Sequence, residues 1–254
     1  MRHISTNKSA GFTIVEMIVI APVVILVIGV FIYAIVIMTG DVLATRSANK
    51  VAYDIQDALN RIESDVKSSN GWLLSSFSTN PQGLNNDGTA FQSSNSVLIL
   101  STFAINDNPL SSNRSLVYKN NAPNPCGSTN IDQNDPITLN IVYFIKDSTL
   151  WRRIVGPPNI DDYKGCDATK TQLTTVEPWQ KPSCSTATPN YPCKTADMKL
   201  IDGVSSLSFN INYDDIVGTP ANSRVSVTIA ATTKAAGRST LQSGTVTAVS
   251  LNKK

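Results

Sequence analysis

The sequence predicts an α+β protein in which one long N-terminal helix packs on an antiparallel β-sheet head. Three observations predict it. Residues 12–38 are almost entirely apolar, residues 39–70 carry apolar side chains at helical spacing, and residues 71–254 alternate short β-prone runs with Ser, Asn, Gly and Pro clusters. A length of 254 residues suits one medium domain plus an anchor better than two packed domains.

The apolar run is long enough to cross a membrane. It contains a single charged residue, Glu16, and about 20 helical residues cross a hydrocarbon core. Arg2 and Lys8 precede the run, and no charge follows it before Asp41. This asymmetry predicts a single-pass protein with its N-terminus in the cytoplasm and its head outside.

An ordinary secretory signal peptide fits this segment poorly. The apolar run exceeds the usual 7–15 residues, and no small-x-small cleavage pattern follows it. A plain signal anchor is the simpler alternative. It leaves two details unexplained: a carboxylate inside the spanning segment, which costs a few kcal/mol, and the abrupt boundary between Gly11 and Phe12.

Gly11, Phe12 and Glu16, after a polar leader and at the start of an apolar run, resemble the class III signal of type IV prepilins. The resemblance implies a pilin fold and cleavage after Gly11 by a prepilin peptidase, which makes residues 1–11 a removed leader. It also implies methylation of the Phe12 amine. In the filament, Glu16 would pair with the Phe12 amine of a neighbouring subunit, since a buried charge needs a partner.

The same resemblance implies the partners and the location. The partners are other pilin or pseudopilin subunits, the prepilin peptidase, an inner-membrane assembly platform, and membrane lipid before assembly. The mature protein would then lie in an extracellular or periplasmic filament. Nothing in the sequence argues directly for nucleic acid, since the net charge is only +2.

The helix is expected to continue beyond the membrane as an amphipathic half that ends near Gly71. Pro22 predicts either a simple kink or a place where the helix melts in a filament. The apolar face is expected to carry Ala48, Val51, Ala52, Ile55, Ala58, Leu59, Ile62 and Val66. The polar face is expected to carry Arg46, Lys50, Asp54, Asp57, Arg61, Asp65 and Lys67.

The head is expected to be antiparallel, because several of its apolar runs alternate with polar residues. Asp147–Thr149 is predicted to connect a hairpin, and a loop is expected between the last two strands. The expected strands are residues 96–103, 115–118, 137–146, 150–155, 204–213, 224–231 and 245–251.

A second resemblance concerns the later half of the chain. Tyr143-Phe144-Ile145, followed by Leu150-Trp151-Arg152-Arg153, is similar to a hairpin of W-type minor pilins and J-type pseudopilins of type II secretion. The segments 200–214, 225–231 and 245–251 resemble their later strands. The resemblance implies a minor subunit.

Four cysteines lie in the loop-rich second half: Cys126, Cys166, Cys184 and Cys193. An even number downstream of an export segment predicts two disulfides with three possible connectivities. We favour Cys184–Cys193 with Cys126–Cys166, because this pairing closes one short loop. A zinc site is disfavoured, since no CxxC occurs and the one histidine, His3, lies in the leader.

No catalytic or cofactor-binding motif is recognisable, so the sequence predicts neither an enzyme nor a cofactor. Alternating oxygen ligands at Asn130, Asp132 and Asn134 make a weak calcium candidate, because this segment lacks the glycine and closing glutamate of an EF-hand.

The expected function is therefore structural: a minor pilin or pseudopilin that helps to initiate or cap a type IV pilus, a secretion pseudopilus or a DNA-uptake filament. Three alternatives stay open. The chain could be a major filament subunit, a tip adhesin, or a signal-anchored surface protein that never polymerises.

Overall fold

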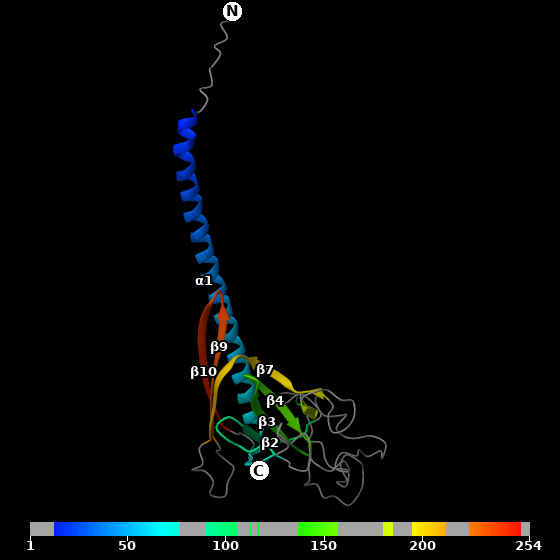
Figure 1. Cartoon of the computed structure of the whole chain (residues 1–254). Helices are drawn as coiled ribbons and strands as arrows, with labels where there is room; N and C mark the ends of the chain where they lie inside the picture. The colour runs from blue at the N-terminus through cyan, green and yellow to red at the C-terminus, as the bar shows by residue number, and fades with distance from the viewer. Residues whose placement is uncertain are drawn as a thin grey trace, which may run out of the picture. The chain divides into compact units, whose positions relative to one another are not determined.

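The computed structural model describes residues 13–76, 90–105, 112, 116, 137–156, 180–184, 195–211 and 224–249. Within them lie one helix, α1 (Ile14–Ser68), and ten strands (Figure 1). The predicted α+β class is confirmed, with one long, initially apolar helix near the N-terminus and sheets that are chiefly antiparallel. The chain forms two compact units: the helix up to Ser47 with Lys234–Arg238, and a head made of the remaining described residues.

Helix α1 is continuous through Pro22. Its C-terminal end is set by Ser69, whose backbone N–H and side-chain hydroxyl both donate to the carbonyl of Val66, at 3.2 and 2.7 Å. These bonds satisfy a carbonyl that the helix itself leaves open. The helix therefore ends slightly before the predicted stop at Gly71. Gly71 has a φ of 143° and is instead the first residue of β1.

The larger sheet of the head has five antiparallel strands in the order β1-β2-β3-β4-β7. They are β1 (Gly71–Trp72), β2 (Leu98–Phe103), β3 (Thr138–Lys146), β4 (Thr149–Val155) and β7 (Met198–Asp202). Strands β2, β3 and β4 agree with the prediction. The predicted β3–β4 hairpin is also confirmed: its two-residue turn has φ angles of 52° at Asp147 and 56° at Ser148, as a tight hairpin turn requires.

The second sheet has the order β10-β9-β8. Its strands are β8 (Val204–Ile211), β9 (Arg224–Ala235) and β10 (Arg238–Val249). The prediction of a loop between the last two strands is wrong. Both strands run on to a two-residue turn, Ala236-Gly237, with φ angles of 51° and 77°. A short parallel pair, β5 (Ser183–Cys184) with β6 (Thr195–Ala196), was not predicted either.

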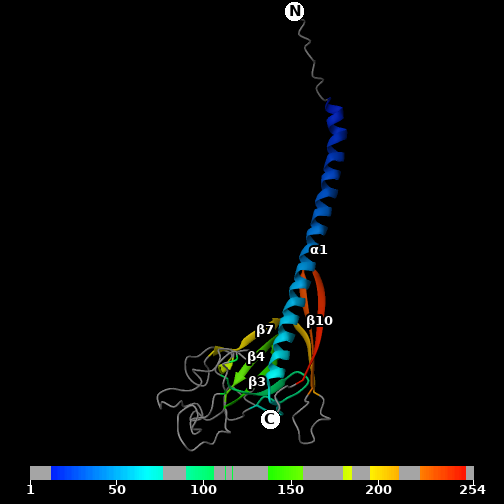
Figure 2. The same ribbon diagram turned by 180° about the vertical axis from the view of Figure 1, so that it is seen from behind.

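Two apolar clusters cover the two faces of the five-stranded sheet. The main core joins the amphipathic half of α1 to both larger sheets (Figure 1, Figure 2). From α1 it takes Val51, Ile55, Ala58, Leu59, Ile62 and Val66. A smaller cluster comprises Phe91, Ile99, Val142, Phe144 and Val155. Successive residues of β2 and β3 enter different clusters, as the period of two in a strand requires.

Gly203, between β7 and β8, is expected to be intolerant of a side chain. Its φ is 69°, and an added Cβ would lie 2.6 Å from the Thr232 carbonyl oxygen. Left-handed backbone costs an L-residue about 1–2 kcal/mol, and overpacking adds about 1–3 kcal/mol. Gly203→Ala should therefore lower the free energy of unfolding by about 2–5 kcal/mol in denaturant titrations.

Gly237→Ala is the matched control, because Gly237 has a φ of 77° and open space around an added Cβ. It should cost only the backbone contribution, about 1–2 kcal/mol. Equal losses in the two variants would contradict the steric account of Gly203.

Candidate functional site

The start of α1 is closed by a reciprocal pair, Thr13 and Glu16. The Thr13 backbone N–H and hydroxyl both donate to Glu16 Oε2 at 2.9 Å, and the Glu16 N–H donates to the Thr13 hydroxyl at 3.3 Å. This is a capping box, which satisfies N–H groups that a helix start leaves open. The Thr-x-x-Glu spacing was visible in the sequence and was missed as a cap. It gives Glu16 a partner inside its own chain.

Gly11 and Phe12, the residues of the predicted cleavage boundary, lie outside the described residues. The capping box begins at the next residue, Thr13. The carboxylate of Glu16 is therefore held at the end of the helix that adjoins the boundary. Negative charge is also favoured there by the helix dipole.

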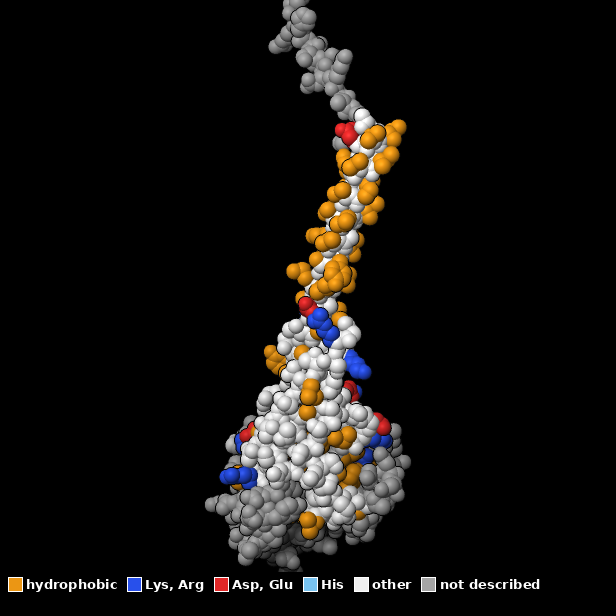
Figure 3. Space-filling view, turned by 60° about the vertical axis from the view of Figure 1, so that its left-hand side comes forward, with side chains coloured by type: hydrophobic (Ala, Val, Ile, Leu, Met, Phe, Trp, Pro, Cys, Tyr) orange, Lys and Arg blue, Asp and Glu red, His pale blue; other side chains and the backbone are white. Residues whose placement is uncertain are grey.

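Beyond this cap, every side chain from Ile14 to Met38 is exposed. Figure 3 shows hydrophobic side chains along the whole stretch, ending where acidic and basic ones begin. By length and composition α1 could cross a membrane, and it is compatible with a membrane anchor. The 25 or so residues rise about 37 Å, against about 30 Å of hydrocarbon.

The polar side chains just beyond the apolar stretch bond within the helix. The Thr39 hydroxyl donates to the Ile35 carbonyl at 2.8 Å, and the Thr45 hydroxyl donates to the Asp41 carbonyl at 2.9 Å. Such bonds to a carbonyl four residues earlier keep these hydroxyls satisfied within the helix itself.

The turn of the β9–β10 hairpin lies beside the same part of the helix. A Cβ built on Gly40 would lie 3.6 Å from the Cβ of Ala236. Arg238 Nη1 forms an ion pair with Asp41 Oδ1, and the two side chains stay 63% and 51% exposed. The hairpin turn is thus fastened to α1 just after its apolar stretch.

Inside the head, Asp65 of α1 is buried, contrary to the prediction that placed it on the polar face. Asp65 and Arg152 are each 2% exposed and form an ion pair, with Arg152 Nε 2.6 Å from Asp65 Oδ2. The Tyr143 hydroxyl donates to the same oxygen at 2.5 Å. One carboxylate therefore links the helix to both β3 and β4.

The local environment fixes the protonation of the two strand residues. Burial, reinforced by the Asp65 charge, raises the pKa of Tyr143 well above its ordinary value, so Tyr143 stays a neutral donor. Burial by itself would lower the pKa of Arg152, but the neighbouring Asp65 and Tyr143 hold it above its ordinary value. Tyr143 therefore stays neutral and Arg152 stays charged at ordinary pH, and both hold the Asp65 carboxylate in a structural clamp.

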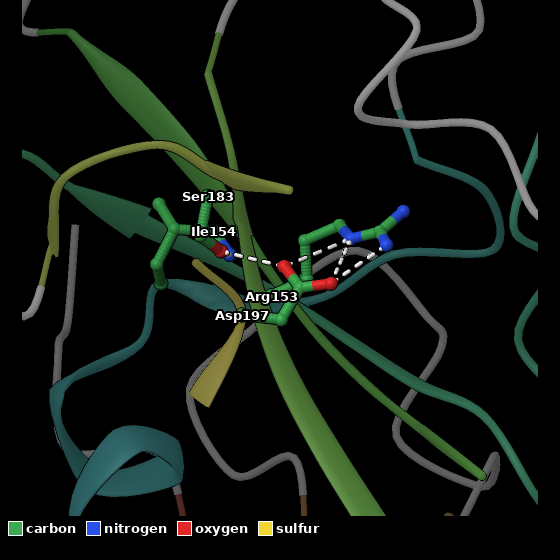
Figure 4. Close-up of polar contacts among 4 residues, drawn as sticks. All are labelled: Arg153, Ile154, Ser183 and Asp197. Carbon is green, nitrogen blue, oxygen red and sulfur yellow. Dashed lines mark hydrogen bonds and ion pairs between the residues drawn. The ribbon is translucent and has the colours of Figure 1, made fainter. Parts of the chain in front are cut away.

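The next residue along β4, Arg153, makes a second clamp on the other side of the sheet (Figure 4). Its Nε lies 3.1 Å from both carboxylate oxygens of Asp197, and Nη2 lies 2.7 Å from Oδ2. The guanidinium also stacks over Phe91 and Phe144, 5.5 and 5.1 Å from the ring centroids. Such a forked pair is directional and strong.

Ser183 completes this second clamp. Its hydroxyl donates to Asp197 Oδ1 at 2.9 Å and accepts from the Ile154 N–H at 3.0 Å. The Asp197 N–H donates to the Cys184 carbonyl at 2.7 Å. The clamp therefore ties β5, which contains Cys184, to the main sheet.

Most of the remaining predicted sites fall outside the described residues, including Cys126, Cys166 and Cys193, the calcium candidates Asn130, Asp132 and Asn134, and His3. Cys184 lies in β5 and is disulfide-bonded. The pairing of the four cysteines stays a prediction. In the part of the chain that the structure describes, no group of three His, Cys, Asp or Glu could hold a metal ion.

Comparisons with known proteins found no match among family models, curated proteins or solved structures.

Proposed function

We propose that this chain is a membrane-anchored subunit of a type IV pilin-like filament, cut after Gly11 by a prepilin peptidase. The observation that carries the proposal is the difference in exposure and composition between the two halves of α1. Its first half is wholly exposed and, apart from Glu16 at its start, almost entirely apolar, and the same helix continues as an amphipathic half that packs on antiparallel strands. A helix that is apolar all round needs lipid or neighbouring helices around it.

The start of the helix supports the same proposal. Glu16 is the one charge in the apolar segment, and it lies in the first helical turn, beside the boundary where Gly11 meets Phe12. Cleavage there would create a cationic amine within about one helical turn of a carboxylate. In a filament, the amine and the carboxylate of neighbouring subunits can satisfy one another and so set the register of packing.

Within this class we favour a minor pilin or pseudopilin that helps to initiate or cap a filament. The support is the hairpin Tyr143–Arg153, whose resemblance to W-type minor pilins and J-type pseudopilins rests on residues that also form the head's clamps. Its partners would be other subunits, the prepilin peptidase, an inner-membrane assembly platform and, before assembly, lipid. A major subunit or a tip adhesin are variants of the same proposal.

A second candidate is a signal-anchored surface protein that never polymerises. The capping box favours it, because Thr13 alone accounts for the carboxylate of Glu16. The N-terminal mass of the mature protein from its native host separates the two. We expect a chain that begins at methylated Phe12, and we expect Gly11→Val to retain Met1, since a β-branched residue replaces the small one at the cut.

A wild-type chain that begins at Met1 would contradict the filament proposal and favour the signal-anchored surface protein. A chain cut after another residue would sink the assignment of Gly11.

A further inference from the structure

One cationic feature plays no part in the proposed assembly. We call it the cationic tip: Lys234 and Arg238, which flank the β9–β10 turn, with Asp41 and Arg46 on the helix beside it. These are the charged residues of 40–47 and 234–238, three cations against one carboxylate. All four are exposed. Asp41 forms an ion pair with Arg238, which fastens the turn to α1. Since Asp41 is the one carboxylate among the four, the tip keeps an excess of positive charge.

The helix puts this tip at a definite depth if α1 spans a membrane. Starting at Glu16, about 20 residues cross the roughly 30 Å of hydrocarbon and end at about residue 36. The headgroup layer adds about 5–8 Å, or roughly four more residues. Gly40 and Asp41, where the turn contacts the helix, therefore fall in or just beyond the headgroup layer.

The composition of the turn fits that layer. Ala235, Ala236 and Gly237 carry no bulky or acidic group that would hold the backbone away from a lipid surface. Val42 and Leu43, each 49% exposed, continue the apolar surface of the helix beside it. Cations next to an apolar anchor are attracted to anionic lipid.

We infer that the cationic tip binds the headgroups of anionic phospholipids at the outer surface of the membrane before assembly. The inference rests on the proposed membrane anchor and extends it to a lipid class. Lys234 and Arg238 contact lipid phosphates, while Asp41 holds the turn against α1.

The test uses the full-length chain in detergent micelles that contain equal amounts of phosphatidylglycerol and phosphatidylcholine, with retained lipid identified by native mass spectrometry. We expect the wild type to retain phosphatidylglycerol in preference. Lys234→Gln with Arg238→Gln should lower that preference at least about fivefold, because each cation near an anionic surface is worth about that factor. The wild-type preference should fall as salt rises.

Lys67→Gln is the matched control. It removes one exposed cation from α1 about 40 Å farther along the helix, and it should leave the preference unchanged. No preference in the wild type, or an equal preference in the double variant, would overturn the inference. The inference would also be overturned if the wild type formed a dimer and the double variant did not, because the tip would then mediate contact between two copies of the chain.

Alkaline extraction of the same chain from membranes distinguishes failure of the lipid-binding inference from failure of the proposed membrane anchor. A chain that stays in the membrane without lipid preference refutes the cationic tip alone. A chain that is extracted refutes the anchor on which the inference rests.

Discussion

Replacing Asp65 by alanine is expected to lower the free energy of unfolding by about 3–5 kcal/mol, because it leaves the buried Arg152 charge without its counter-charge. The Tyr143 hydroxyl loses the same acceptor. Total stabilities are about 5–15 kcal/mol, so this loss is a large share. Denaturant titration of the full-length chain in detergent, followed by tryptophan fluorescence, measures it.

The control is Glu63→Ala, one of the nearest carboxylates on the same helix. Glu63 pairs with Lys67 at 2.6 Å, with side chains 29% and 47% exposed, so its loss should cost less than about 1 kcal/mol. Asp65→Leu combined with Arg152→Met should recover most of the stability, because it removes both charges together. If Asp65→Ala costs no more than Glu63→Ala, the clamp contributes nothing.

The two halves of α1 could be predicted because each follows from a local pattern. The apolar run can be recognised from its composition alone, and the packed half from apolar residues that recur at spacings of three and four. Val51, Ile55, Ala58, Leu59, Ile62 and Val66 are all buried as predicted. Ala52 was assigned to the same face and is exposed, since a small side chain marks the direction of a helix face weakly.

The clamps could not be predicted, because their partners are far apart in the chain. Tyr143 lies 78 residues from Asp65, and Arg152 lies 87 residues from it. A helical pattern assigns a carboxylate to the solvent face unless a buried cation is known to face it. The one available signal was adjacent arginines on a strand, which must point to opposite faces of a sheet.

The long β9–β10 hairpin was missed for a related reason. Residues 232–244 include alanine, lysine and glycine, which are depleted in strands, and the threonines among them are not part of a regular alternation with apolar residues. Cross-strand contacts such as Thr228 with Thr245, whose hydroxyls are 3.0 Å apart, accompany the pairing instead. Gly244 allows close packing on α1, where an added Cβ would lie 2.9 Å from atoms of Ile55 and Leu59.

Glu16→Gln is expected to separate the two roles that Glu16 could have. A capping box accepts glutamine as well as glutamate, so the helix start should survive. The negative charge is lost, and the Phe12 amine of a neighbouring subunit would then be buried without its counter-charge. Since such a loss costs several kcal/mol, and about 1.4 kcal/mol is tenfold, incorporation into filaments should fall more than tenfold while cleavage continues.

Thr13→Ala makes the opposite change, because it removes the hydroxyl of the cap and keeps the carboxylate. It should weaken the helix start by about 1 kcal/mol and leave incorporation within a few-fold of wild type. Both variants are compared as the ratio of filament-bound to total processed subunit, which corrects for any change in cleavage. If Thr13→Ala abolishes incorporation and Glu16→Gln does not, Glu16 acts as a helix cap, and the charge that sets subunit register must lie elsewhere.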